Sequence, residues 1–278
     1  MNVSPREPDG GGVRGEGPWP FVTRYSFIQA GRRTVRGARQ HRKGLGGEDV
    51  NALPFWQSAR YNWTTGAFFA VGSLLFMLGS LLSLIPTDVA PSTFAINVVL
   101  FLGSVPFTIA GYLQHFQAAN TPAFRADGTV ARGQESIELI GWNPRSPGWL
   151  STFTQFIGTL AFNVSTFNAI IVSNRAFVQD LAVWTPDVIG SVLFLVSGYL
   201  AFLESSHGYW SWKPKDLAWQ IVFVNLLGCV AFMTSGILAY VPTGPEAAWI
   251  IDASNSHLLL GALCFFIGAV LSMKESRA

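Results

Sequence analysis

Asparagine side chains inside apolar segments are the residues whose chemistry is most informative in this chain. Asn163 and Asn168 lie in one long apolar segment, and Asn225 lies in a later one. An amide within a lipid bilayer is costly unless it finds a polar partner, so such residues either hydrogen-bond between helices or line a functional path. Both interpretations stay open, and the second makes these three residues a candidate polar path of a channel or facilitator for a small neutral solute.

A second group of side chains has the chemistry of metal or haem ligands. His115 and His207 follow apolar segments, and Glu204 lies about one helical turn before His207. Imidazole and carboxylate groups are common ligands of metals, and haem iron often takes an axial histidine. Because their spacing matches no ligand pattern, we expect no cofactor and no metal site. A membrane enzyme or cofactor-binding protein that uses these three residues is retained as an alternative.

Motifs of familiar enzymes do not occur in the sequence. It contains no phosphate-binding loop, no H-E-x-x-H and no G-x-S-x-G, which are the patterns of nucleotide hydrolysis, zinc proteolysis and serine hydrolysis. We therefore expect no catalytic residues and no enzymatic activity.

Six apolar segments must position all of these residues. Each is close to the roughly 20 residues that cross a bilayer core of about 30 Å, and none carries Lys, Arg, Asp or Glu in its central turns. Hydrophobic residues make up 50% of the chain and charged residues 12%, as is typical of membrane proteins. We predict an all-α, polytopic membrane protein with six transmembrane helices. The segments are residues 64–85, 92–114, 149–173, 186–205, 217–240 and 255–273.

Basic residues predict the orientation of these helices. With six spans, 17 of the 18 Lys and Arg residues fall on one side, and only Arg175 falls on the other. The positive-inside rule then places both termini in the cytoplasm. We expect a multi-pass protein of the cell inner (plasma) membrane.

An internal repeat groups the six segments into three related hairpins. Each segment has a glycine, a phenylalanine four residues later, and two small residues at the seventh and eighth positions, all on one helical face. Small residues let membrane helices approach closely, so we interpret these stripes as helix-packing seams. The repeat glycines are Gly72, Gly103, Gly158, Gly190, Gly228 and Gly261.

The first hairpin resembles a known family. Tyr61-Asn62-Trp63, followed by G-S-L-L-F and Gly79-Ser80, is similar to the YrhK-like membrane domain, a two-helix hairpin known mostly from bacteria. The match is best over residues 61–114 and extends loosely over 60–273. The resemblance implies tandem two-helix hairpins, and it implies no activity because the family is uncharacterised.

A basic tail precedes the first hairpin. A cytoplasmic basic run near a membrane attracts anionic lipid headgroups, and we expect a short interfacial helix here with Arg32, Arg33, Arg36 and Arg39 facing lipid. Nucleic-acid binding is not expected, because no domain that reads bases is evident. The predicted division is a disordered to interfacial basic cytoplasmic tail (1–60), hairpin 1 (61–115), a cytoplasmic loop (116–148), hairpin 2 (149–206), and hairpin 3 with a short C-terminal end (207–278).

The leading prediction of function is a non-enzymatic structural, accessory or partner-binding membrane protein. Its expected partners are the lipid bilayer and anionic headgroups, together with either another protein or a second copy of the chain.

Overall fold

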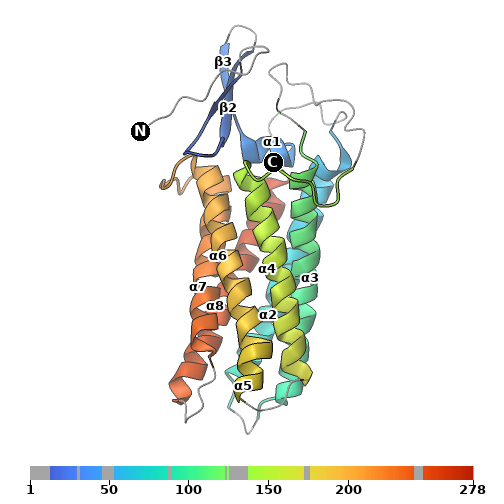
Figure 1. Cartoon of the computed structure of the whole chain (residues 1–278), viewed down its shortest axis with the longest axis vertical. Helices are drawn as coiled ribbons and strands as arrows, with labels where there is room; N and C mark the ends of the chain where they lie inside the picture. The colour runs from blue at the N-terminus through green and yellow to red at the C-terminus, as the bar shows by residue number, and fades with distance from the viewer. Residues whose placement is uncertain are drawn as a thin grey trace.

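Long helices run side by side and carry a small β-sheet at one end (Figure 1). The computed structural model describes residues 13–29, 32–45, 53–86, 89–122, 124, 137–171, 176–240 and 247–277. The chain is mostly helical, at 72%, and the sheet is the one departure from the all-α class expected from the sequence.

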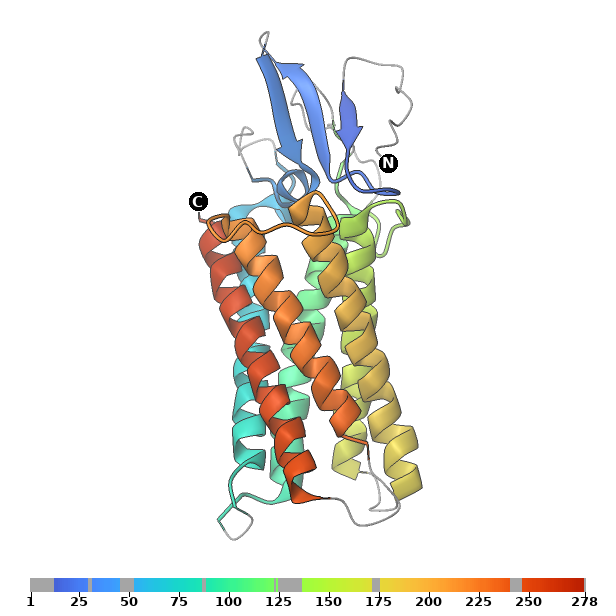
Figure 2. The same ribbon diagram turned by 90° about the vertical axis from the view of Figure 1, so that its left-hand side faces the viewer.

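Among the described residues, six long helices close into a ring. Each packs against the next in the chain, and the last packs against the first, so that all six surround a common axis (Figure 2). Short turns precede the first and fourth of them, namely η2 (Phe55–Gln57), and α5 (Ala176–Gln179) with η3 (Asp180–Trp184). The long helices are α2 (Ala59–Ser83), α3 (Thr93–Ala119), α4 (Pro147–Ile171), α6 (Thr185–Ser206), α7 (Leu217–Leu238) and α8 (Ala248–Glu275).

The ends of these helices follow from local capping residues. The Ser58 hydroxyl accepts a hydrogen bond from the Tyr61 backbone N–H, and the Asp216 carboxylate accepts from the first turn of α7. Such side chains satisfy N–H groups that have no partner within the helix. The caps set where α2 and α7 begin, at the end of the bundle that carries the sheet.

Five helices in the described part of the chain are long and apolar enough to cross a membrane. The exception in the ring is α4, which is as long as α2 but carries nine hydroxyl or amide side chains. The apolar helices are compatible with an integral membrane protein. Helix α4 is long enough to cross a membrane, and it differs from the other five helices in its polar composition.

Glycines face each other across three of the helix contacts. A Cβ atom on Gly72 would lie 2.9 Å from the carbonyl oxygen of Gly103 and 2.4 Å from the ring of Phe107. The reverse contact is similar, since a Cβ on Gly103 would lie 3.2 Å from the Gly72 oxygen. Only a residue without a side chain allows the two backbones to come this close. The equivalent pairs, Gly158 with Gly190 and Gly228 with Gly261, give 3.1–3.2 Å.

A layer of six phenylalanine rings, one from each long helix, fills the axis of the ring. All six are buried. Within the three glycine-paired helix pairs the ring centroids are 5.0–5.5 Å apart, and most meet edge to face. Edge-to-face pairs add about 0.5–1.5 kcal/mol each beyond the apolar area they bury. We call this set the phenylalanine layer: Phe76, Phe107, Phe162, Phe194, Phe232 and Phe265.

The tail before α2 forms an antiparallel sheet. Strands β1 (Arg14–Glu16), β2 (Arg24–Gln29) and β3 (Arg32–Gly37) pair in chain order, and helix α1 (Ala38–Lys43) follows directly. The interfacial helix expected in this basic tail is therefore wrong for residues 24–29 and 32–37, which form β2 and β3, with Tyr25 and Phe27 on β2. Both rings pack against Phe124, at centroid distances of 4.4 and 5.2 Å.

Candidate functional site

An axial cavity of about 100 Å³ lies between the phenylalanine layer and helix α1. Every long helix contributes to its wall, so the cavity exists only because the ring closes. Phe194 and Phe265 form part of its apolar end together with Phe69, while α1 supplies the other end.

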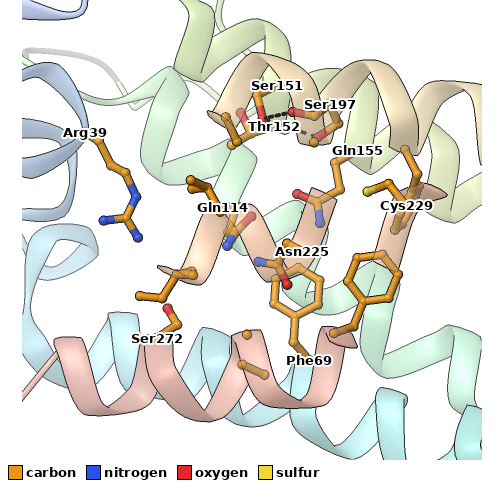
Figure 3. Close-up of a pocket in the computed structure, with 18 of the residues that line it drawn as sticks. Arg39, Phe69, Gln114, Ser151, Thr152, Gln155, Ser197, Asn225, Cys229 and Ser272 are labelled. Atoms are coloured by element: carbon orange, nitrogen blue, oxygen red, sulfur yellow. Dashed lines mark hydrogen bonds between the residues drawn. The ribbon is translucent and has the colours of Figure 1, made fainter. Parts of the chain in front are cut away.

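Four side-chain amides line this cavity, and three of them differ from the fourth, Gln117, which donates to the Trp56 carbonyl and to Asn62 Oδ1. Gln114 comes from α3, Gln155 from α4 and Asn225 from α7, and they point into a common space in Figure 3. None of the three makes a hydrogen bond to another residue in the described part of the chain. An amide left without a partner away from water costs about 1–3 kcal/mol. All three side chains are half-buried and their polar groups are accessible from the cavity, so water or another polar molecule there can satisfy them.

Gly268 makes room for one of these amides. A Cβ atom at this position of α8 would lie 2.1 Å from Oδ1 of Asn225. The missing side chain lets the Asn225 amide lie against the α8 backbone. A larger residue at position 268 would push the amide out of its place.

Three cations of α1 close the cavity. They are Arg39, Arg42 and Lys43, which we call the cationic cap, and all three belong to the cavity lining. Their spacing of three and four residues places them on one face of a helix. Each is held by a carboxylate at the end of a long helix: Glu275 for two of them, and Glu204 for the third.

The ion pairs of the cap are buried and well formed. Arg42 donates to both carboxylate oxygens of Glu204 at 2.6 and 2.9 Å. Arg39 pairs with both oxygens of Glu275, and Lys43 Nζ lies 2.8 Å from one of them. Bidentate pairs of this kind fix direction as well as distance, so the cap cannot move without leaving charges unpaired.

The bundle also holds the C-terminal end of α1 through its backbone. Asn62 Nδ2 donates to the Lys43 carbonyl at 2.8 Å, and Gln57 Nε2 donates to the His41 carbonyl at 2.9 Å. The helix ends at Gly44, whose φ of 66° is the left-handed conformation that favours glycine. Carbonyls at a helix end have no helical partner, and here α2 and η2 supply one.

Gly148 is needed for the Arg42–Glu204 pair. A Cβ atom there would lie 1.5 Å from Nη1 of Arg42 and 2.6 Å from Oε1 of Glu204. Because Gly148, in the first turn of α4, has no side chain, the Arg42 guanidinium can reach the Glu204 carboxylate.

The pKa of the Lys43 ammonium is lower than its usual value. Burial and the nearby Arg39 guanidinium lower its pKa to about 8, although Glu275 acts in the opposite direction. Arg42 contributes a smaller repulsion. The cap is therefore crowded with positive charge.

The three predicted path residues do not lie together in one site. Asn225 lines the cavity, whereas Asn163 Nδ2 donates to Thr108 Oγ1 at 2.8 Å. Asn168 Nδ2 donates to the carbonyl of Ala182 at 2.7 Å. The latter two amides thus make helix–helix hydrogen bonds, which is the structural interpretation left open by the sequence.

The two histidines and the carboxylate of the alternative ligand set do not converge on one site. Glu204 holds Arg42, while His115 is buried with Nδ1 3.3 Å from Thr152 Oγ1. His207 ends α6 in a left-handed conformation. Within the described ranges, no group of three or more His, Cys, Asp or Glu side chains could hold a metal ion.

The four arginines expected to face lipid headgroups differ in their surroundings. Arg32 and Arg33 are exposed on β3, and Arg36 is partly buried. Arg39 points inward to Glu275, so it does not face headgroups as expected. Its position follows from the chain order, since α1 continues from β3 across the end of the bundle.

Neither the cationic cap nor two of the cavity amides, Gln114 and Gln155, is among the site residues expected from the sequence. The signal for the cap was the helical spacing of Arg39, Arg42 and Lys43, together with acidic residues at the ends of two apolar segments. The signal for Gln114 and Gln155 was weaker, because a glutamine near a helix end is common in membrane proteins.

The fold and the cavity define a ring of long, mostly apolar helices around a polar, capped chamber. No protein-family model, curated protein or solved structure matches the chain.

Proposed function

We propose that this chain is a non-enzymatic integral membrane protein that binds a small polar molecule in its axial cavity. The observation that carries the proposal is the convergence of three unpartnered amides, Gln114, Gln155 and Asn225, in one chamber. Ligand sites typically combine an apolar wall with a few polar groups that fix orientation. The phenylalanine layer provides such a wall here.

Six membrane spans, arranged as three related hairpins, are part of this proposal. The reciprocal glycine contacts support the hairpins. For α4, the threonine hydroxyls bond within the helix: Thr154 Oγ1 donates to Leu150 O and Thr166 Oγ1 to Phe162 O. Hydroxyls satisfied in this way are tolerated in a bilayer, which supports α4 as the sixth span.

An apolar outer surface supports insertion in lipid. Leu74, Leu78 and Leu81 of α2 are exposed, as are Val192 and Val196 of α6. Exposed apolar surface on this scale marks an interaction with a membrane or a partner. A second copy of the chain or another protein could cover part of it.

The orientation belongs to the proposal as well. The cap, the sheet and the end of α8 lie at one end of the bundle (Figure 1), and the positive-inside rule assigns that end to the cytoplasm of an inner-membrane protein. Arg32 and Arg33 are exposed beside the turn between β2 and β3, at the end of the sheet away from the bundle (Figure 1), so the contact of the tail with anionic headgroups is proposed on its charge alone. The relation of residues 61–114 to the YrhK-like hairpin is proposed on its motifs alone.

Binding is favoured over facilitated passage of a neutral solute. The phenylalanine layer closes the axis on one side of the cavity, and Asn163 and Asn168 beyond it are hydrogen-bonded. A facilitator would require six packed rings to separate in every transport cycle.

The test is equilibrium binding to the full chain in lipid nanodiscs, with isotope-labelled propionate and propionamide as probes of equal size. We expect at least one of them to bind, and Asn225→Leu to weaken that binding about fivefold, because it removes one polar contact worth about 1 kcal/mol. Asn168→Leu is the matched control, since it removes an intramembrane amide outside the cavity. If neither probe binds at millimolar concentrations, the proposed function is wrong.

A further inference from the structure

The cavity lining is electrostatically one-sided. Its described residues include the three cations of the cationic cap and no Asp or Glu. The carboxylates of Glu204 and Glu275 lie behind the cations and use their oxygens to bind them. A molecule inside the chamber therefore contacts the cations directly, and the carboxylates of Glu204 and Glu275 lie behind those cations.

The charges of this buried cluster do not balance. Three cations face two carboxylates, which leaves one positive charge in excess. Asp216 also acts on Arg39, but its carboxylate is at the exposed start of α7 and caps that helix. Each cation has a carboxylate partner, but Arg39 and Lys43 share Glu275, so the cluster has a net positive charge among the described residues and favours an added anion.

Helix dipoles do not alter this balance. Three long helices begin at the cap end of the bundle and three end there. Positive N-terminal and negative C-terminal ends therefore alternate around the cavity mouth, and their fields largely cancel. The side chains of α1 decide the sign of the potential.

We propose that the ligand of the axial cavity is a short-chain monocarboxylate. Its carboxylate lies at the cationic cap and accepts hydrogen bonds from Lys43 and the cavity amides, and its short apolar tail lies against Phe194 and Phe265. This assignment rests on the proposed function, because it names the ligand class of the same site.

The size of the cavity limits the length of that tail. An apolar protein cavity of about 150 Å³ holds a benzene molecule, so a chamber of about 100 Å³ accepts a smaller solute. Acids of two to four carbons, roughly, meet this limit, whereas sugars, aromatic acids and fatty acids exceed it.

The deciding comparison is propionate against propionamide on the unmodified protein in nanodiscs. The two probes have the same size and differ in charge, and we expect propionate to bind at least about tenfold more tightly, the effect of one charge-assisted hydrogen bond. Equal or tighter binding of propionamide would overturn the carboxylate assignment and leave the proposed solute-binding function intact. Binding of neither probe would overturn both. Competition by chloride at equal concentration would assign the site to any small anion and would also overturn the assignment.

A charge variant provides a second, independent readout. Lys43→Gln keeps a polar side chain of similar reach and removes the excess charge, so propionate affinity should fall about 10- to 100-fold while propionamide affinity changes little. Arg33→Gln changes the total charge equally on the exposed sheet and serves as the control. An equal loss in both variants would show a long-range effect of net charge and would contradict a local site.

Propionate affinity should also depend on pH. Because burial and neighbouring Arg39 and Arg42 lower the pKa of Lys43 to about 8, its ammonium loses a proton above that pH and the cluster loses its excess charge. Glu275 is the opposing group on α8 and stays ionised throughout this range. We expect constant affinity from pH 6 to about 8 and a decline toward about tenfold per pH unit above it. A flat profile up to pH 10 would separate binding from the Lys43 charge.

Discussion

Replacing Glu204 with glutamine should detach helix α1 from the bundle. The substitution keeps the shape of the side chain but removes the charge that both N–H groups of Arg42 bind. The Glu204 side chain is only 1% exposed, so water cannot take its place. Breaking a buried ion pair from one side typically costs about 3–5 kcal/mol. The excess positive charge of the cluster would also grow by one.

The effect is measured as the unfolding temperature in detergent and as hydrogen exchange in residues 38–43. We expect a lower unfolding temperature and rapid exchange in α1. Glu16→Gln is the matched control, because Glu16 pairs with Arg24 and Arg33 at the surface, where such pairs are worth about 1 kcal/mol or less. Equal effects of the two substitutions would refute a structural role for the buried pair.

A compensating variant separates lost charge balance from lost packing. The double substitution Glu204→Gln with Arg42→Met removes both charges, so it should recover much of the stability lost in the single variant. It should leave the excess charge of the cluster unchanged, because one cation and one carboxylate are removed together. A double variant no more stable than Glu204→Gln would show that packing around Arg42, and not its charge, holds α1.

The sequence predicts where the long helices lie along the chain, because their positions depend on local patterns. The phenylalanine four residues after each glycine is an example. Since the offset is the same in all six segments, the rings must occur at a similar depth, and they form one layer at the axis. The length of each apolar segment is likewise evident from neighbouring residues in the sequence.

The cap could not be predicted in the same way, because it depends on contacts between distant parts of the chain. Arg42 lies 162 positions before Glu204, and Arg39 lies 236 positions before Glu275. A run of arginines near a membrane has an ordinary explanation in lipid headgroups, and nothing local distinguishes a buried arginine from an exposed one. Only the closed ring places Glu204 and Glu275 under α1.

The amides of the candidate site also show that the sequence predicts local features but not contacts between distant parts of the chain. Asn225 was accessible to sequence reasoning because an amide inside an apolar segment is conspicuous. Asn163 and Asn168 carried the same signal, yet each finds a partner on another segment of the chain. Whether an intramembrane amide is bonded or free depends on its rotation around the helix and on the neighbour it faces. Both the rotation and the neighbour are set by the tertiary structure.

The glycine seams lead to the second large effect, on the assembly of the ring. Gly72→Ala should destabilise the bundle by about 1–3 kcal/mol, because the new Cβ would lie 2.9 Å from the Gly103 oxygen and 2.4 Å from the Phe107 ring. The backbone contact cannot relax by a side-chain rotation, so α2 and α3 must separate, and the phenylalanine layer must open with them.

Gly111→Ala is the matched control for this seam, since it makes the same change inside α3. Its Cβ would meet the nearest atom, a methyl group of Thr159, at an ordinary 3.4 Å. Alanine also favours a helix over glycine by about 1 kcal/mol, so this variant should be neutral or more stable. The measurement is the unfolding temperature of both variants in the same detergent. If Gly72→Ala is tolerated as well as Gly111→Ala, the repeated glycines are not packing seams, and the close approach of α2 and α3 needs another cause.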